Sequence, residues 1–204
     1  TFHPAMVAAK KMEKKIHDQL EESGANKQLR HTSFEMALFG TGIMKGPFAI
    51  DKEYPNWNEE GEYDPIIKTV PSTSHVSVWN FYPDPDAYNM DEAEYVIERH
   101  RMTRSQMRGL KSRPFFRTDS VEKAIQLGES YDKKYWEQDM QDDDQQSGSP
   151  ERYEVLEFWG YVDTDILEEN GVRIPRDLKN AEQVNVNVWV CNNEVLRLVL
   201  NPFK

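Results

Sequence analysis

Residues 184–200 read VNVNVWVCNNEVLRLVL, and this stretch decides the fold. Valine occupies every second position from 184 to 190, with Asn or Trp between, which is the pattern of a strand with one buried face. Asn192-Asn193 follows, and a second apolar run begins at Val195. Because asparagine tolerates the positive φ angles of a two-residue type I′ turn, the stretch predicts an antiparallel β-hairpin.

Five apolar runs upstream of this hairpin, bounded by turn-forming residues, predict further strands: Gly40–Ile50, Pro65–Val70, His75–Trp79, Glu94–Arg101 and Tyr153–Asp163. Residues 51–64 contain proline, asparagine and glycine, and we expect a loop or a hairpin tip there. Most of these strands are close together along the chain, which favours antiparallel pairing.

Five segments carry helix signals, either apolar spacing of three and four or an N-terminal cap: Pro4–Ser23, Asn26–Phe39, Thr103–Lys111, Asp119–Gln138 and Asp163–Asn170. Thr103 with Gln106 forms a capping-box pattern, and Asp119 with Glu122 repeats it. The sequence therefore predicts an α+β fold. It is a mostly antiparallel sheet with two to three amphipathic helices packed on it and a C-terminal β-hairpin, and we expect residues 1–204 to form a single region.

The charge is unevenly distributed along the chain. The 204 residues carry 36 acidic and 25 basic side chains, a net charge of −11. Residues 129–169 alone have a net charge of −11, so the remainder is balanced. Within them, Asp139–Pro150 has almost nothing to bury, and we expect residues 139–150 to form a flexible acidic loop.

A basic stretch, residues 99–117, holds seven Lys and Arg side chains, His100 and no acid. It predicts either a face that complements an acidic one, within the fold or between subunits, or a contact with nucleic acid. The residues that we assign to such a contact are Arg99, Arg101, Arg104, Arg108 and Lys111. Because phosphate neutralisation drives DNA affinity, so acidic a chain is not expected to bind DNA strongly on its own.

Motifs for catalysis, metals or cofactors are missing from the sequence. A calcium loop starting at Asp84 would need glycine and glutamate where Asn89 and Tyr95 stand. The glycines of residues 40–46 match no phosphate-binding pattern, and the five histidines have no ligand spacing. Cys191 is the one cysteine, which excludes an internal disulfide, and no apolar run is long enough to span a membrane. We predict no catalytic, metal or cofactor-binding residues, no cofactor and no enzyme.

Several phrases, in this order, resemble the portal (head-to-tail connector) proteins of short-tailed bacteriophages. They are AAKKME (8–13), FGTGIMKGP (39–47), FYPDPDA (81–87), DEAEYVIERH (91–100), MTRSQM (102–107), Trp159-Gly160, VCNNEVLR (190–197) and NPF (201–203). The resemblance extends over most of the chain. It implies the wing region of a longer portal chain, with stem helices and a clip expected after Lys204.

The resemblance also implies a function. It implies a structural subunit of a ring of identical copies, normally a dodecamer, at the portal vertex of the virion, assembled in the host cytoplasm. Double-stranded DNA is packaged and ejected through such a ring. Its implied partners are the terminase packaging ATPase, capsid and scaffold proteins and tail adaptors, with no membrane. The alternative is a nucleic-acid-binding module that uses residues 99–117.

Overall fold

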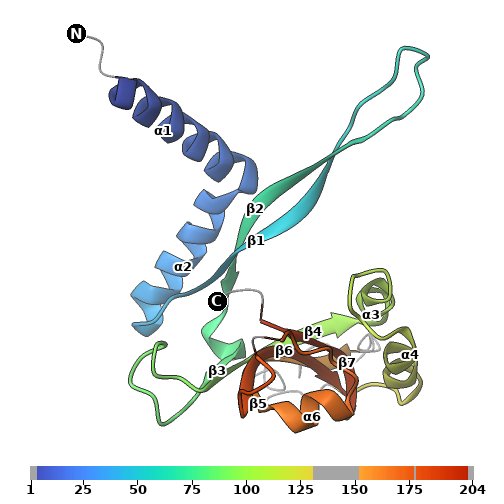
Figure 1. Cartoon of the computed structure of the whole chain (residues 1–204). Helices are drawn as coiled ribbons and strands as arrows, with labels where there is room; N and C mark the ends of the chain where they lie inside the picture. The colour runs from blue at the N-terminus through green and yellow to red at the C-terminus, as the bar shows by residue number, and fades with distance from the viewer. Residues whose placement is uncertain (1–3, 131–151, 177, 202–204) are drawn as a thin grey trace, which may run out of the picture. The chain divides into compact units, whose positions relative to one another are not determined.

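The computed structural model describes residues 4–130, 152–176 and 178–201, and the α+β class is confirmed (Figure 1). The chain divides into two compact units, an N-terminal unit (Thr1–Trp79) and a C-terminal unit (Asn80–Lys204). Each unit is described by itself below. The acidic loop expected at 139–150 lies outside the described residues. The assignment of residues 1–204 to one portal wing stays a prediction.

The N-terminal unit consists of two helices and one long hairpin: α1 (Pro4–Ser23), α2 (Ala25–Phe39), β1 (Ile43–Tyr54) and β2 (Ile66–Val76). Gly24, with φ of 70°, separates the helices, and Gly40, with φ of 77°, ends α2 by donating its N–H to the carbonyl of Met36. Both helices match the predicted segments, because glycine adopts this left-handed conformation without a steric cost.

The strands of this unit differ from the prediction. The segments expected as two strands, 65–70 and 75–79, form the single strand β2, which ends at Val76 and is followed by a 3₁₀ turn, Val78–Asn80. Pro71 does not interrupt β2, because in a two-stranded sheet each strand has an unpaired side that tolerates a missing N–H. Strand β1 continues to Tyr54, beyond the predicted Ile50, so the tip expected at 51–64 is shorter. An isolated bridge joins Trp57 to Tyr63 within it.

The described residues of the C-terminal unit form a five-stranded antiparallel sheet, with strands in the order β3-β4-β5-β6-β7, and three short helices (Figure 1). The strands are β3 (Phe81–Pro83), β4 (Tyr95–Thr103), β5 (Arg152–Asp163), β6 (Gln183–Cys191) and β7 (Glu194–Leu200). The helices are α3 (Arg104–Leu110), α4 (Thr118–Gln126) and α6 (Thr164–Glu169). The predicted hairpin is confirmed: β6 pairs with β7, and Asn192 and Asn193 have φ of 52° and 62°.

Both faces of this sheet are covered. One core lies under α3 and α4 and contains the buried residues Met107, Leu110, Val121, Ala124, Ile125, Tyr153, Val155, Trp189, Cys191 and Leu196. The other lies on the opposite face and contains Leu167, Ile174, Val184 and Val186. Because successive residues of a strand point to opposite faces, Val184 and Val186 lie in the second core and Trp189 and Cys191 lie in the first.

The two predicted capping boxes have different outcomes. Thr103 caps α3 as expected, since its hydroxyl accepts from the Gln106 N–H and the Gln106 side chain accepts from the Thr103 N–H. The second prediction is wrong: α4 begins one residue earlier, after Arg117, and no side chain caps it. The helix also ends at Gln126, because Gly128 with φ of 90° turns the chain, and the part of the predicted helix from 131 to 138 lies outside the described residues.

Candidate functional site

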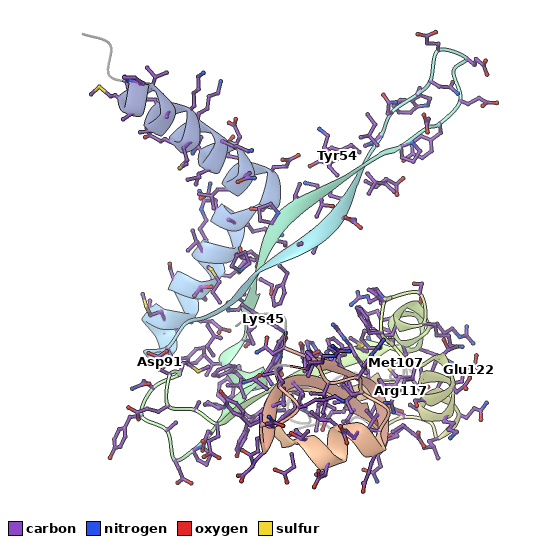
Figure 2. All side chains as sticks on the ribbon, viewed as in Figure 1. Lys45, Tyr54, Asp91, Met107, Arg117 and Glu122 are labelled. Carbon is purple, nitrogen blue, oxygen red and sulfur yellow. The ribbon has the colours of Figure 1, made fainter. Side chains whose placement is uncertain are left out.

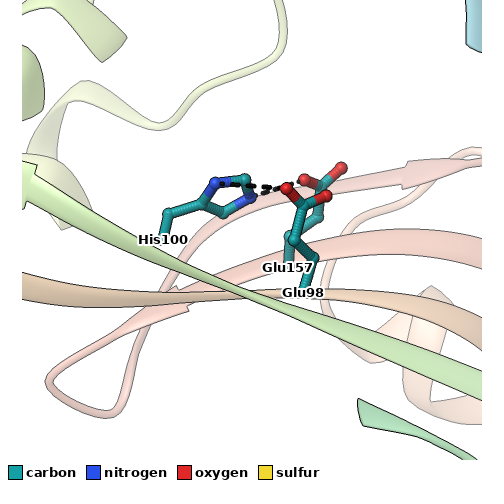
Figure 3. Close-up of side chains that lie close together, drawn as sticks. All are labelled: Glu98, His100 and Glu157. Carbon is teal, nitrogen blue, oxygen red and sulfur yellow. Dashed lines mark hydrogen bonds and ion pairs between the residues drawn. The ribbon is translucent and has the colours of Figure 1, made fainter. Parts of the chain in front are cut away.

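Three ionisable side chains meet on one face of the five-stranded sheet. The strand register places Glu98 of β4 directly opposite Glu157 of β5. His100 lies two residues beyond Glu98 on β4, and therefore on the same face. Figure 3 shows the imidazole ring edge-on to the two carboxylates. We call these three residues the Glu–His–Glu cluster.

The side chains of the cluster are in close contact. The Nε2 atom of His100 lies 2.8 Å from Oε2 of Glu157, and its Nδ1 atom lies 3.7 Å from Oε1 of Glu98. One ligand atom from each of the three residues lies within 4.8 Å of the other two. The exposed side-chain fractions are 4% for Glu157, 15% for Glu98 and 23% for His100. The cluster is therefore largely shielded, with His100 as its most accessible member.

Neighbouring strands fix Glu157 and His100 in place. The second carboxylate oxygen of Glu157 accepts hydrogen bonds from Nε1 of Trp159 (2.9 Å) and from Nδ2 of Asn187 (3.1 Å). Asn187 in turn accepts from Nε1 of Trp189 at 3.1 Å. The Trp189 ring stacks on the His100 ring, with centroids 4.9 Å apart and planes 10° apart. Strands β5 and β6 thus orient two of the three cluster members.

The electrostatics of the cluster favour a positive charge. Two carboxylates directly opposite each other on one sheet face repel, and burial strengthens that repulsion. Protonated His100 or a bound cation would offset it. Arg197 of β7 also interacts with the charge of Glu157. Burial lowers the pKa of the Arg197 guanidinium, and the charge of Glu157 acts in the opposite direction. That guanidinium lies 5.5 Å from the centroid of the Phe116 ring.

The one cysteine of the chain is poorly suited to act as a nucleophile. Cys191 is buried on β6, and burial raises the pKa of its thiol, with the hydroxyl of Ser130 3.8 Å from its sulfur. A thiol with a raised pKa carries little thiolate at neutral pH. Cys191 is therefore not a candidate site residue. Among the described residues, the Glu–His–Glu cluster is the candidate site, and its chemistry suits the binding of a cation.

The basic stretch does not form one surface. Arg99 lies on the opposite sheet face from His100, is 6% exposed, and pairs with Glu154 at 2.6 Å. Lys111 pairs with Glu122 at 2.5 Å. Among the predicted contact residues, Arg101, Arg104 and Arg108 are exposed, the last two one turn apart on α3. Arg99 and Lys111 thus have acidic partners within the fold.

The sequence gives only a partial signal for the cluster. Glu98 and His100 stand two positions apart in a predicted strand, which places them on one face, but a single glutamate and histidine are common in strands. Glu157 is remote in sequence and joins them only through the register of β4 on β5. The spacing between histidines gives no signal for this site, because the site has one histidine and two carboxylates from different strands.

No protein-family model matches the chain, and no curated protein shows detectable similarity to it. The resemblance to portal proteins therefore stays a prediction. None of the described helices combines the length and the apolar character that crossing a bilayer requires.

Proposed function

We propose that the chain is a non-catalytic structural subunit of the portal ring of a tailed bacteriophage, through which double-stranded DNA enters and leaves the capsid. The short phrases that resemble portal proteins, found in order over most of the sequence, support this proposal. In that role the chain contacts further copies of itself in the ring, and capsid, packaging and tail proteins at the ring's surfaces.

One observation carries the proposal: the N-terminal unit exposes the apolar faces of its helices. Among the described residues of α1 and α2, only Ala25 is buried. Met6 and Met12 are 67% and 65% exposed, and the side chains of α1 project away from the helix in Figure 2. Further exposed apolar residues on the two helices are Ile16, Leu20, Leu29, Phe34, Met36, Leu38 and Phe39. A large exposed apolar surface is typical of a contact with another protein.

The overall charge of −11 is consistent with a conduit for DNA. An acidic surface repels the phosphate backbone, so DNA passes along it without being held. The two ion pairs described above, Arg99 with Glu154 and Lys111 with Glu122, also reduce the positive charge available to phosphates.

Self-association is tested by native mass spectrometry and light scattering over a range of protein concentrations. We expect the chain to form oligomers, and Ile16→Asp to shift them to monomers, because it places a charge in the apolar face of α1. Lys15→Asp is the matched control on the polar face of the same helix, and we expect it to retain the oligomers. A wild-type chain that stays monomeric at every concentration contradicts the proposal.

The alternative function is a nucleic-acid-binding module, and the exposure of Arg104 and Arg108 on α3 favours it. A salt titration of binding to duplex DNA separates the two functions. If the chain is a conduit, binding is weak at physiological salt, and Arg104→Ala with Arg108→Ala leaves it unchanged. If it is a binding module, the double substitution removes the binding and lowers its salt dependence.

A further inference from the structure

We propose that the Glu–His–Glu cluster binds one divalent transition-metal ion, with Zn²⁺ as the ion that it fits best. Glu98, His100 and Glu157 each supply one ligand atom. This site is independent of the portal function proposed above, because it lies within one chain and does not require a neighbouring copy.

The donor set and its spacing support a metal ion. Imidazole nitrogen with carboxylate oxygen is a combination that suits zinc, and three protein ligands with one further position is a common zinc arrangement. In a tetrahedral zinc site, neighbouring ligand atoms lie about 3.4 Å apart. The separations in the cluster run from 2.8 Å to at most 4.8 Å. Small side-chain rotations therefore bring all three atoms to coordination distance, without a change in the strands.

The charges of the two glutamates also favour a divalent ion. Glu98 and Glu157 face each other across β4 and β5 and carry two negative charges in a partly shielded place. A divalent ion carries the two positive charges that match them.

Residues around the cluster prepare it for a ligand role. Trp159 and Asn187 donate to Oε1 of Glu157, and the other carboxylate oxygen, Oε2, lies beside His100. Hydrogen bonds of this kind orient metal ligands in proteins. The stacking of His100 on Trp189 fixes the plane of the imidazole. Two of the three ligands are thus positioned before any ion arrives.

Arg197 opposes the binding of a cation. The charge of its guanidinium interacts with that of Glu157, and the guanidinium lies over the Phe116 ring. We therefore expect a weaker site than the structural zinc sites that small domains need for folding. Arg197→Gln is expected to raise the zinc affinity, whereas a cluster that binds no metal gives no such response.

The test is isothermal titration of the metal-free 204-residue chain with Zn²⁺, together with the visible spectrum of the Co²⁺-loaded chain. We expect one equivalent to bind, and Glu98→Gln and His100→Asn each to lower the affinity about tenfold or more. Circular dichroism checks that both variants keep the fold. Glu98→Gln is expected to disturb the fold less than His100→Asn, because glutamine has nearly the same shape as glutamate.

Two surface sites serve as matched controls. His17 lies 3.4 Å from Glu21 on α1, and His31 lies beside His75, with ring centroids 5.9 Å apart. His17→Asn and His31→Asn should leave the affinity unchanged. The proposal is overturned if no stoichiometric binding occurs, if Glu98→Gln and His100→Asn both bind as the wild type does, or if a control variant loses the binding. Each of these results makes the cluster an internal ion pair only.

Discussion

The two units of the molecule use apolar residues in opposite ways. In the C-terminal unit, both faces of the sheet are covered, and large side chains such as Leu110, Tyr153 and Leu196 are fully buried. In the described part of the N-terminal unit, the buried residues are only Ala25, Val70 and Val76. Burial of apolar surface is the main favourable term in folding. The C-terminal unit thus has an apolar core of its own, whereas the helices of the N-terminal unit leave their large apolar side chains exposed.

Polar contacts join the helices of the N-terminal unit to its hairpin. Lys52 donates to the backbone carbonyl of Glu22 at 2.8 Å, and the backbone N–H of His75 donates to the Gln28 side chain at 3.0 Å. Glu35 of α2 accepts from the Ser77 hydroxyl and the Val78 N–H at the end of β2. Removing one partner of such a bond costs more than the bond's net contribution, because the other partner is left unsatisfied. We therefore expect this unit to respond most to polar substitutions and the other unit to apolar ones.

The largest expected effect is the loss of a core side chain from the C-terminal unit. Leu110→Ala should lower the free energy of unfolding by about 2–5 kcal/mol, because Leu110, the last residue of α3, is fully buried in the core. Leu38→Ala on α2 is the matched change in the N-terminal unit, where the side chain is 59% exposed, and we expect about 0.5 kcal/mol or less. Urea denaturation followed by tryptophan fluorescence measures both. Equal losses would contradict the contrast between the two units.

Glu35 is the polar counterpart in the N-terminal unit. Burial raises the pKa of its carboxyl, but hydrogen bonds from Val78 and Ser77 and the nearby His75 outweigh burial, so the pKa is lowered from 4.5. A lowered pKa in the folded state stabilises the fold above pH 4.5, and this contribution is lost as the pH falls through the folded-state value.

Glu35→Ala should therefore destabilise the contact between α2 and β2 by about 1–3 kcal/mol at neutral pH. Hydrogen exchange of the amides of β2 measures this loss. The difference from the wild type should shrink as the pH is lowered below 4.5, the ordinary pKa of the carboxyl. Glu13→Ala on the exposed face of α1 is the control, and an equal change in exchange there would remove Glu35 as the cause.

The cap of α3 gives a smaller effect in the C-terminal unit. Thr103→Ala removes the hydroxyl that accepts from the Gln106 N–H, and should cost about 1 kcal/mol. Ser105→Ala, two residues along on the exposed side of the same helix, should change the free energy of unfolding by a few tenths of a kcal/mol at most. Urea denaturation of the two variants side by side decides this, and a Ser105 effect as large as that of Thr103 would refute the role of the cap.

The sequence predicts those parts of the fold that local chemistry determines. The Asn192-Asn193 turn, the glycine ends of α2 and the cap of α3 all depend on neighbouring residues, and all are confirmed. Pro71 within β2 and the early end of α4 depend on which strands pair and where the chain must turn. Tertiary context decides such features, and a local pattern does not contain it.

The candidate site depends on such context even more strongly. Within the basic stretch, the alternation of side chains separates Arg99 from His100 and places them on opposite faces of one strand. The sequence alone predicts one patch, because like charges close together in the chain favour a common surface. Only the pairing of β4 with β5 shows that Arg99 meets Glu154 and that His100 meets Glu157.

The smallest effect concerns a single proton in the N-terminal unit. The hydroxyl of Tyr54, labelled on the hairpin in Figure 2, donates to the Glu22 carboxylate, and this hydrogen bond raises the pKa of Tyr54 to about 12. The bond holds α1 to β1 below the ordinary tyrosine value of 10.0, and its contribution is lost as the pH rises through about 12.

Glu22→Gln should therefore let Tyr54 ionise at a lower pH, whereas Glu21→Gln, one residue earlier on α1, should not. Nuclear magnetic resonance of ring-labelled tyrosine resolves this one phenol, and the same titration midpoint in all three chains would mean that Glu22 does not hold the hairpin.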